Sequence, residues 1–210
     1  MSFPDFERVV YEKNPLNQVI CQVRFPHVLK IDSTPPAEFQ ERIREIFSEY
    51  QPYRQVPKGV SPGMAPMFPL EHHFRSENGF WQVTLTNGSL SLLCTKYERW
   101  EVFFEQLKKP LDALIELYEP SAFLHVGLRY INVINREELG LTEKKWPDLL
   151  SGFLAGELSD TRVDGQIIHR TSTFIVDLGE SVGKVQIQHG LAVAENVPDQ
   201  LYIIDNDIFY

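Results

Sequence analysis

The predicted secondary structure of this chain of 210 residues repeats itself, and the repeat limits the folds that it can adopt. Residues 18–118 show the periodicity of a strand, a helix, three strands and a second helix. Residues 122–210 repeat a strand, a helix and three strands, and the sequence ends at Tyr210, where the pattern calls for a final helix. Each half alone would leave a sheet face or edge uncovered, so we expect the halves to share one sheet.

The expected fold class is therefore α+β. Two related β-α-β-β-β-α halves form one largely antiparallel sheet covered by helices, and the final helix of the second half is absent. Short matches support the repeat: CQVRF aligns with GLRYI, which places Arg24 and Arg129 at equivalent positions. HFRS and HRTS give an approximate second match of Arg75 with Arg170. We predict a single domain, residues 1–210, built of the half-repeats 18–118 and 122–210.

Strands are predicted where apolar and polar residues alternate. They are residues 18–25, 71–76, 79–97 (a hairpin), 123–134, 166–178, 183–191 and 200–209. The first strand has one apolar face, which holds Val19, Cys21, Val23 and Phe25. In the strand 123–134, the even positions from Leu124 to Tyr130 form the apolar face. The pair Asn87–Gly88 in the hairpin predicts a tight type I′ turn with positive φ angles.

Helices are predicted at 35–50, 99–118 and 142–155 from the spacing of apolar residues. In the second helix the inward residues are expected to be Trp100, Phe103, Phe104, Leu107, Leu111, Leu114, Ile115 and Tyr118. Pro110 should bend that helix or split it. Residues 51–70 hold five prolines and two glycines, so they are expected to form a loop or an arm rather than a helix or a central strand.

The composition excludes several functions. A net charge of −9 argues against a broad surface that tracks nucleic-acid phosphates. The sequence has no run of about 18 apolar residues and no signal peptide at its start, so we expect a cytoplasmic protein without a membrane partner. Its two cysteines, Cys21 and Cys94, lie in apolar strand patterns and are expected to be buried free thiols. No motif predicts a cofactor or a catalytic nucleophile.

Several short motifs, in order along the chain, resemble a sporadically distributed, uncharacterised bacterial protein family. They are Tyr11–Leu16 (YEKNPL), Val19–Pro26 (VICQVRFP), His73–Arg75 (HFR), Tyr97-x-x-Trp100, Arg129–Asn132 (RYIN) and Ile204–Phe209 (IDNDIF). The resemblance covers essentially the whole chain and supports the fold. Members of that family usually continue into a further, largely helical segment, which implies that this chain is shortened. The resemblance implies no activity and no catalytic residues.

Polar residues in predicted central strands are the first candidate site. They are Gln22, Arg24, His125, Arg129 and Arg170. Arginine forks suit carboxylate or phosphate groups, so these residues could bind a small anionic ligand in a groove between the halves. The alternative is that the arginines form ion pairs with Asp and Glu on an exposed sheet face.

Carboxylates and histidines are the second candidate. Asp205 and Asp207 are two apart on a predicted strand and share one face. They could hold Mg²⁺ or serve acid–base chemistry, pair with Arg129 or Arg170, or cap the missing helix. His72 and His73 are adjacent and should point to opposite faces, and the other histidines are scattered. We therefore predict no metal site.

Three functional classes follow from these residues. The first is a non-catalytic binding or assembly protein, with a protein partner or with copies of itself, through edge strands and the arm at 51–70. The second is a sensor for a small anionic ligand, bound by the arginine group. The third is a metal-dependent hydrolase or nuclease that uses Asp205 and Asp207. We favour the first, because the sequence carries no catalytic motif.

Overall fold

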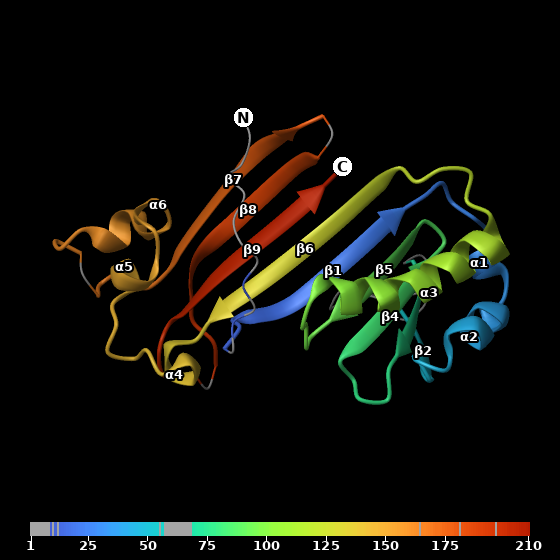
Figure 1. Cartoon of the computed structure of the whole chain (residues 1–210), viewed down its shortest axis with the longest axis horizontal. Helices are drawn as coiled ribbons and strands as arrows, with labels where there is room; N and C mark the ends of the chain where they lie inside the picture. The colour runs from blue at the N-terminus through green and yellow to red at the C-terminus, as the bar shows by residue number, and fades with distance from the viewer. Residues whose placement is uncertain are drawn as a thin grey trace. The chain divides into compact units, whose positions relative to one another are not determined.

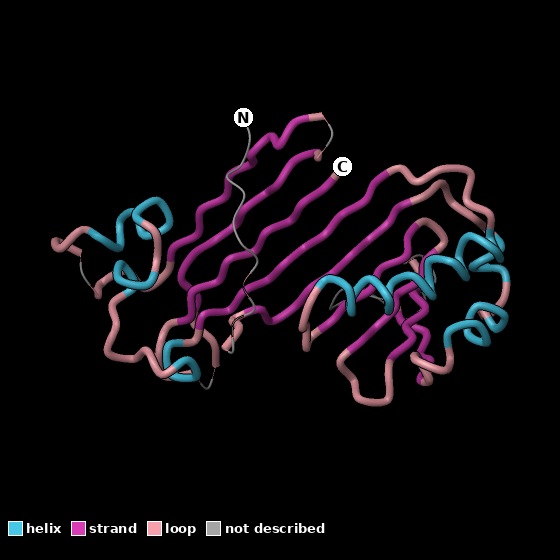
Figure 2. The backbone as a smooth tube through the Cα atoms, in the orientation of Figure 1, coloured by secondary structure: helices cyan, strands magenta, loops and turns pink. Residues whose placement is uncertain are grey.

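The structure is a computed structural model, which describes residues 9, 11, 13–54, 56, 69–163, 165–180, 182–195 and 197–210 (Figures 1 and 2). The first half contains β1 (Leu16–Arg24), α1 (Lys30–Ser33), α2 (Ala37–Ile43), β2 (Glu49–Tyr53), β3 (Glu71–Arg75), β4 (Trp81–Thr86), β5 (Ser89–Cys94) and α3 (Trp100–Tyr118). The second half contains β6 (His125–Ile134), α4 (Arg136–Leu139), α5 (Trp146–Leu149), α6 (Gly152–Ala155), the 3₁₀ helix η2 (Gly156–Ser159), β7 (Arg170–Gly179), β8 (Gly183–Ala192) and β9 (Leu201–Phe209).

The nine strands form one antiparallel sheet in the order β2-β3-β4-β5-β1-β6-β9-β8-β7, which confirms the predicted α+β class. In each half, the opening strand lies beside the last strand: β1 is next to β5, and β6 is next to β9. From there the order runs backwards along the chain, to β3 in one half and to β7 in the other. An internal duplication predicts such related orders. The duplication itself stays a prediction, and β2 has no counterpart in the second half.

The chain divides into two compact units. The first unit holds residues 18–128 and 209–210, and the second unit holds residues 129–208 together with residues 1–17. In the first unit the core lies between one face of the sheet and the helices α2 and α3. Val19, Cys21 and Val23 of β1 are buried on this face, as predicted. Phe39 of α2 packs on Phe74 of β3, with 5.3 Å between ring centroids.

Both cysteines belong to this core. Cys21 and Cys94 are buried free thiols, which confirms the prediction. Burial raises the pKa of the Cys21 thiol to about 11 and also raises the pKa of Cys94. Neither side chain is therefore a reactive thiolate near neutral pH.

The second unit has a smaller core, which α5, α6 and η2 form with one face of β8 and β9. Its buried members are Trp146, Leu150, Ala155, Leu191 and Tyr202. The rings of Trp146 and Tyr202 are 5.6 Å apart. These helical segments are four residues each, so packing against the strands holds them rather than their own hydrogen bonds.

Two predicted helices differ from the observed ones. The prediction of one helix over 35–50 is wrong, because α2 ends at Ile43 and Tyr50 lies in β2, opposite Phe74 of β3. Strand pairing there outweighs helical spacing. The predicted helix over 142–155 is also wrong: it is divided into α5 and α6, and Gly156, with φ at +46°, ends α6. α4 precedes them, capped by the side chain of Asn135.

The long helix α3 matches the predicted boundaries, but two details differ. Of the two expected effects of Pro110, a split is wrong, because the residue is buried inside a helix that continues to Tyr118, and a bend stays a prediction. Phe103, Leu107 and Leu114 are buried as predicted, whereas Trp100, Phe104 and Ile115 are exposed. The buried stripe is therefore narrower than the apolar spacing predicted.

The hairpin of β4 and β5 forms with Asn87 and Gly88 as its two-residue loop, but neither residue has a positive φ. The type I′ prediction is therefore wrong. The carbonyl oxygens of these two residues accept hydrogen bonds from the N–H groups of Val28 and Phe25, at 2.8 and 3.0 Å. Those contacts, distant in sequence, decide the turn geometry.

Two further expectations concern strands. Residues 51–53 of the predicted loop or arm belong to β2, an edge strand in which Pro52 is tolerated. Most of the rest of that segment, residues 55 and 57–68, lies outside the described residues. In the strand predicted over 123–134, Leu124 and Val126 are exposed, so the expected apolar face is not covered there.

One glycine controls how closely β7 and β8 approach. A Cβ atom at Gly190 of β8 would lie 1.8 Å from the carbonyl oxygen of Arg170 on β7. Real Cβ atoms cannot come that close to a backbone atom. Every residue other than glycine would therefore push the two strands apart.

We expect Gly190→Ala to lower the free energy of unfolding by about 1–3 kcal/mol or more, because the backbone of β7 must move. Urea unfolding followed by circular dichroism measures the change. Gly152→Ala is the matched control, since a Cβ there meets nothing within 4 Å in a helical residue. It should leave stability unchanged or raise it by up to about 1 kcal/mol. Equal stability of both variants would contradict the proposed close approach.

Candidate functional site

The structure distributes the predicted binding residues over both units: Gln22, Arg24 and His125 in the first, and Arg129 and Arg170 in the second. Arg24 Nε donates to Gln22 Oε1 at 3.0 Å. The backbone N–H of Leu124, just before β6, donates to the carbonyl of Arg24 at 2.7 Å. His125 stacks on Phe209, with 5.9 Å between ring centroids. A groove that joins Arg24 to Arg129 stays a prediction.

Arg129 forms an ion pair across the sheet. Its Nε donates to Asp205 Oδ1 at 2.8 Å, and its Nη2 donates to Oδ2 of the same carboxylate. This confirms the alternative in which Asp205 pairs with an arginine. A guanidinium that already holds a carboxylate on two of its nitrogens has lost most of its capacity to bind an anionic ligand.

Arg170 fixes the short helices of the second unit to β7. Its Nη1 donates to the carbonyl oxygens of Leu154 and Ala155, at 2.8 and 3.4 Å, at the end of α6. Its Nε lies 2.8 Å from Glu157 Oε2, an ion pair that lacks hydrogen-bond geometry. The carbonyls at a helix end have no partner within the helix, so Arg170 supplies one from the sheet. We assign Arg170 a structural role.

Replacing Arg170 by lysine is expected to lower the free energy of unfolding by about 1.5–3 kcal/mol, because one ammonium cannot reach both carbonyls and the carboxylate. Arg24→Lys, at an exposed position on β1, is the matched control and should stay within about 0.5 kcal/mol of wild type. Chemical unfolding of the three proteins under one buffer makes the comparison. A variant at Arg170 that is as stable as the control would refute the structural role.

Two histidines are buried, one in each unit. His72 Nδ1 lies 3.0 Å from the hydroxyl of Tyr50. His189 Nδ1 lies 2.6 Å from the hydroxyl of Tyr202, which itself donates to the carbonyl of Leu154. That hydroxyl therefore accepts from His189, which fixes the proton on Nδ1. Burial lowers the pKa of both imidazoles, and the charge of Arg170 lowers the pKa of His189 further.

These lowered pKa values predict a loss of stability in acid. Below the ordinary histidine pKa of 6.5, His72 and His189 are protonated in the unfolded chain but remain neutral in the folded chain. The free energy of unfolding should therefore be constant above that pH and fall as the pH drops through it. The free energy of unfolding can be measured at several pH values between pH 8 and pH 5. Its dependence on pH should be weaker in a variant that carries both His72→Phe and His189→Phe than in wild type.

Phe74→Leu serves as a control for that measurement, because it perturbs the core of the first unit without removing a titratable group. It should lower the free energy of unfolding by the same amount at all pH values, so that the dependence of this free energy on pH stays unchanged. A pH dependence that is identical in wild type and the double histidine variant would exclude these two residues as its origin.

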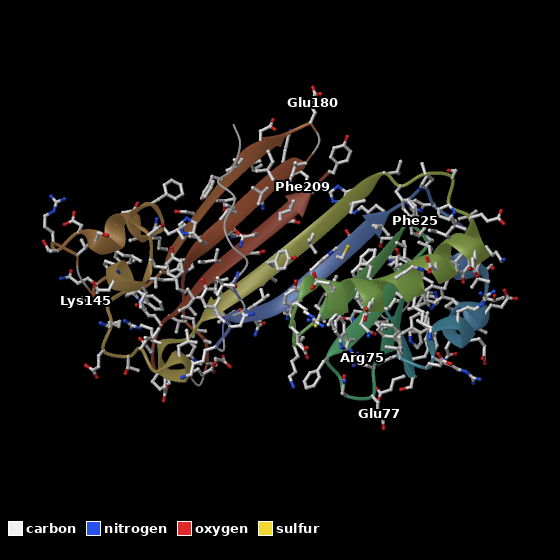
Figure 3. The ribbon with its side chains drawn as sticks, in the orientation of Figure 1. Phe25, Arg75, Glu77, Lys145, Glu180 and Phe209 are labelled. Carbon is white, nitrogen blue, oxygen red and sulfur yellow. The ribbon has the colours of Figure 1, made fainter. Side chains whose placement is uncertain are left out.

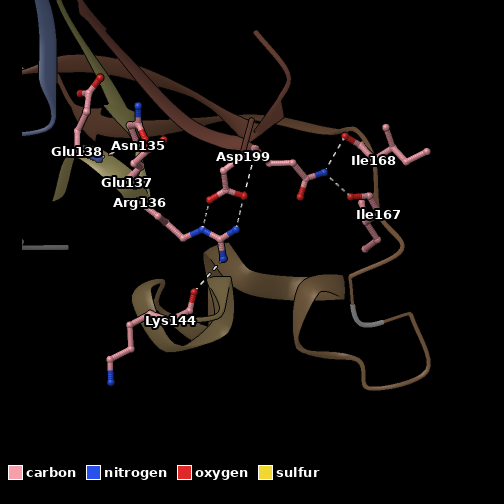
Figure 4. A network of polar contacts seen from close by, with 9 residues as sticks. Asn135, Arg136, Glu137, Glu138, Lys144, Ile167, Ile168 and Asp199 are labelled. Carbon is pink, nitrogen blue, oxygen red and sulfur yellow. Dashed lines mark hydrogen bonds and ion pairs between the residues drawn. The ribbon is translucent and has the colours of Figure 1, made fainter. Parts of the chain in front are cut away.

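A polar network joins α4 to the loop before β9 (Figure 4). Arg136 Nε donates to Asp199 at 2.8 Å, Nη2 donates to the same carboxylate, and Nη1 donates to the carbonyl of Lys144. The guanidinium also lies over the ring of Trp146, 4.4 Å from its centroid. A cavity of about 340 Å³ opens beside these residues, lined by Gln200 among others. Every guanidinium nitrogen of Arg136 already donates a hydrogen bond, so the network stabilises this wall of the cavity.

The described histidines and carboxylates do not form a metal site. His72 and His73 point to opposite faces, as predicted, and His73 Nε2 contacts Glu71 at 2.7 Å. Asp205 is held by Arg129. Within the described part of the chain, no three residues of the types His, Cys, Asp and Glu are placed to hold a metal ion.

The outer edge of β7 is a candidate interaction site. β7 and β2 end the strand order. β2 is a five-residue strand interrupted by Pro52, which blunts it, whereas β7 is ten residues long and contains no proline. Among the described strands, none pairs with the outer side of β7. Glu180 projects from the chain just beyond β7 (Figure 3).

Large apolar side chains are exposed along β7. We call them, with the open strand edge, the β7 surface: Phe153 (72% exposed), Ile168 (75%), Ile175 (59%) and Val182 (52%). The ring of Phe153 meets Phe174 of β7 edge to face, 5.2 Å between centroids. Ile175, next to Phe174, lies on the opposite face of the strand. Apolar side chains thus flank the open edge on both faces of the sheet.

Comparisons with known proteins add no function: no family model, no curated protein and no solved structure matches the chain. The similarity to a sporadically distributed bacterial family stays a prediction. Among the described residues, no helix combines the length and apolar character needed to cross a membrane.

Sequence reasoning did not single out the β7 surface, although part of its signal is present. The segment Arg170–Gly179 has one acidic residue, one arginine, no proline and no lysine, which is unusual for an edge strand. The sequence alone does not tell which strand lies at an edge. Phe153 joins the surface only because α6 packs beside β7.

Proposed function

We propose that this chain is a non-catalytic binding or assembly protein, which joins other chains by adding a strand to β7. The observation that carries the proposal is the position of the ten-residue strand β7 at the end of the described strand order, with exposed apolar side chains on both of its faces. Strand addition uses backbone hydrogen bonds for affinity and the alternating side chains for specificity.

The energetics favour such an interface. An added strand would pair backbone N–H and C=O groups along β7 and remove Ile175 and Phe153 from water. Complete burial of an aliphatic or aromatic side chain contributes about 1.5–3 kcal/mol. Exposed apolar groups next to an open edge mark interaction sites in soluble proteins.

The described charges give less support to the two other classes. A sensor for a small anion needs available guanidinium groups, but Arg129 holds Asp205 and Arg170 holds Glu157 with two helix carbonyls. A metal-dependent hydrolase based on Asp205 and Asp207 would need the carboxylate of Asp205, which Arg129 binds on both oxygens.

Lysine at the β7 surface should abolish the association. In the double variant Ile175→Lys, Phe153→Lys, two charges would have to be desolvated when a strand is added. Light scattering after size exclusion should give wild type a mass above the 24.3 kDa of one chain, and the variant a mass of one chain. Leu124→Lys, which replaces an exposed apolar residue of the first unit, should behave like wild type.

Affinity capture completes the test for a partner other than the chain itself. A partner at the β7 surface is retained by wild type and by Leu124→Lys and lost by the double variant. If wild type has the mass of one chain and captures the same proteins as the double variant, the proposed function is wrong.

A further inference from the structure

We propose that the strand added to β7 is β7 of a second copy of this chain, antiparallel to the first and with Phe174 opposite Phe174 of that copy. This inference rests on the proposed function, and it names the partner and the register. It would produce a two-fold symmetric dimer with one continuous sheet.

Symmetry restricts the registers that need to be compared. Most protein dimers have a two-fold axis, so that the same surface is used by both copies. When this axis stands perpendicular to a continuous sheet, directly opposite residues must point to the same face. Because side chains alternate along a strand, the residue at the axis must then lie opposite the same residue of the second copy. Thr173, Phe174 and Ile175 lie at the centre of β7, so three registers need to be compared.

The register centred on Phe174 matches the chemistry of both faces. On the helix side it places the two Phe174 rings together, beside the two Phe153 rings that contact them. On the other face it places Thr173 opposite Ile175 and Thr171 opposite Asp177 of the second copy. Aromatic pairs and β-branched pairs are favourable across strands, and a threonine hydroxyl can donate to a carboxylate.

The neighbouring registers separate the two Phe174 rings. Centring on Ile175 keeps a threonine opposite the aspartate, Thr173 with Asp177, and pairs the two Ile175 side chains, but it places Phe174 opposite Val176. Centring on Thr173 places Phe174 opposite Ser172, which separates the two aromatic rings. Within Arg170–Gly179, the registers centred on Phe174 and on Ile175 oppose equally long runs, residues 170–178 and 171–179, whereas the register centred on Thr173 opposes a shorter run, residues 170–176.

The charge of Arg170 does not oppose this register. An unpaired guanidinium opposite Leu178 would be unfavourable, but Arg170 is bound to Glu157 and to the carbonyls of α6 within its own chain. Asp177 is the only acidic residue of β7, and it meets a hydroxyl rather than another carboxylate. No like charges are therefore placed opposite one another along the strand.

Single cysteines in the full-length chain can report the register. The two native cysteines are buried, and the raised pKa of Cys21 keeps that thiol protonated, so an introduced exposed cysteine reacts first. Thr173→Cys mixed with Ile175→Cys reports the Phe174 register, since those positions are directly opposite. Thr173→Cys alone reports the Thr173 register, and Ile175→Cys alone reports the Ile175 register. Residues two positions out of register are too far apart for a disulfide.

We expect mild oxidation to link Thr173→Cys to Ile175→Cys several-fold faster than it links either variant to itself, with the linked peptides identified by mass spectrometry. Light scattering should give wild type twice the mass of one chain. The double lysine variant should give the mass of one chain.

The outcomes separate this inference from the proposed function. One outcome is that the double lysine variant dissociates the dimer, but that oxidation links two copies of Thr173→Cys, or two copies of Ile175→Cys, to each other. It would overturn the register and keep the proposed function. A wild-type monomer that captures a partner through the β7 surface overturns the second copy as partner and also keeps that function. A dimer that the lysine variant leaves intact overturns both.

Discussion

Backbone groups in an antiparallel sheet point alternately to the two neighbouring strands, so a strand at an edge keeps about half of them unpaired. β2 and β7 occupy the two ends of the strand order. β2 is short and carries Pro52, which removes one N–H from the row. β7 has ten residues without a proline, and exposed Ile175 and Phe153 flank it. The proposed assembly follows from this difference between the two edge strands in length, proline content and exposed apolar side chains.

Charged side chains serve a different purpose in the described structure. Arg129 holds a carboxylate across the sheet, Arg136 holds another beside the ring of Trp146, and Arg170 holds the end of α6. A guanidinium that is partly removed from water needs such partners, because its desolvation is costly. In the second unit Arg136 and Arg170 hold four-residue helices that are too short to be stable alone, whereas Arg129 links the neighbouring strands β6 and β9. Their side chains are used for folding, which leaves backbone edges and apolar groups as the surfaces for association.

The strands predicted from alternating apolar and polar residues agree with the structure better than the predicted helices do. The alternation in residues 16–24 and 170–179 is local, and the structure keeps it in β1 and β7. Helical spacing was less reliable, because pairing with β3 drew Tyr50 into β2 and Gly156 divided a predicted helix. Of the candidate site residues, the pairing of Asp205 with Arg129 could be anticipated from strand positions. The bonds of Arg170 could not, because they join residues whose approach depends on how α6 packs.

The sequence by itself determined the fold class and the burial of both cysteines. These properties depend on the alternation of side chains along each strand, which is encoded locally. Only the tertiary structure decided which strands end the sheet, which side chains neutralise the arginines, and where Phe153 lies. Those properties depend on contacts between residues far apart in the chain, such as Gly190 with the backbone of Arg170, and no local pattern contains them.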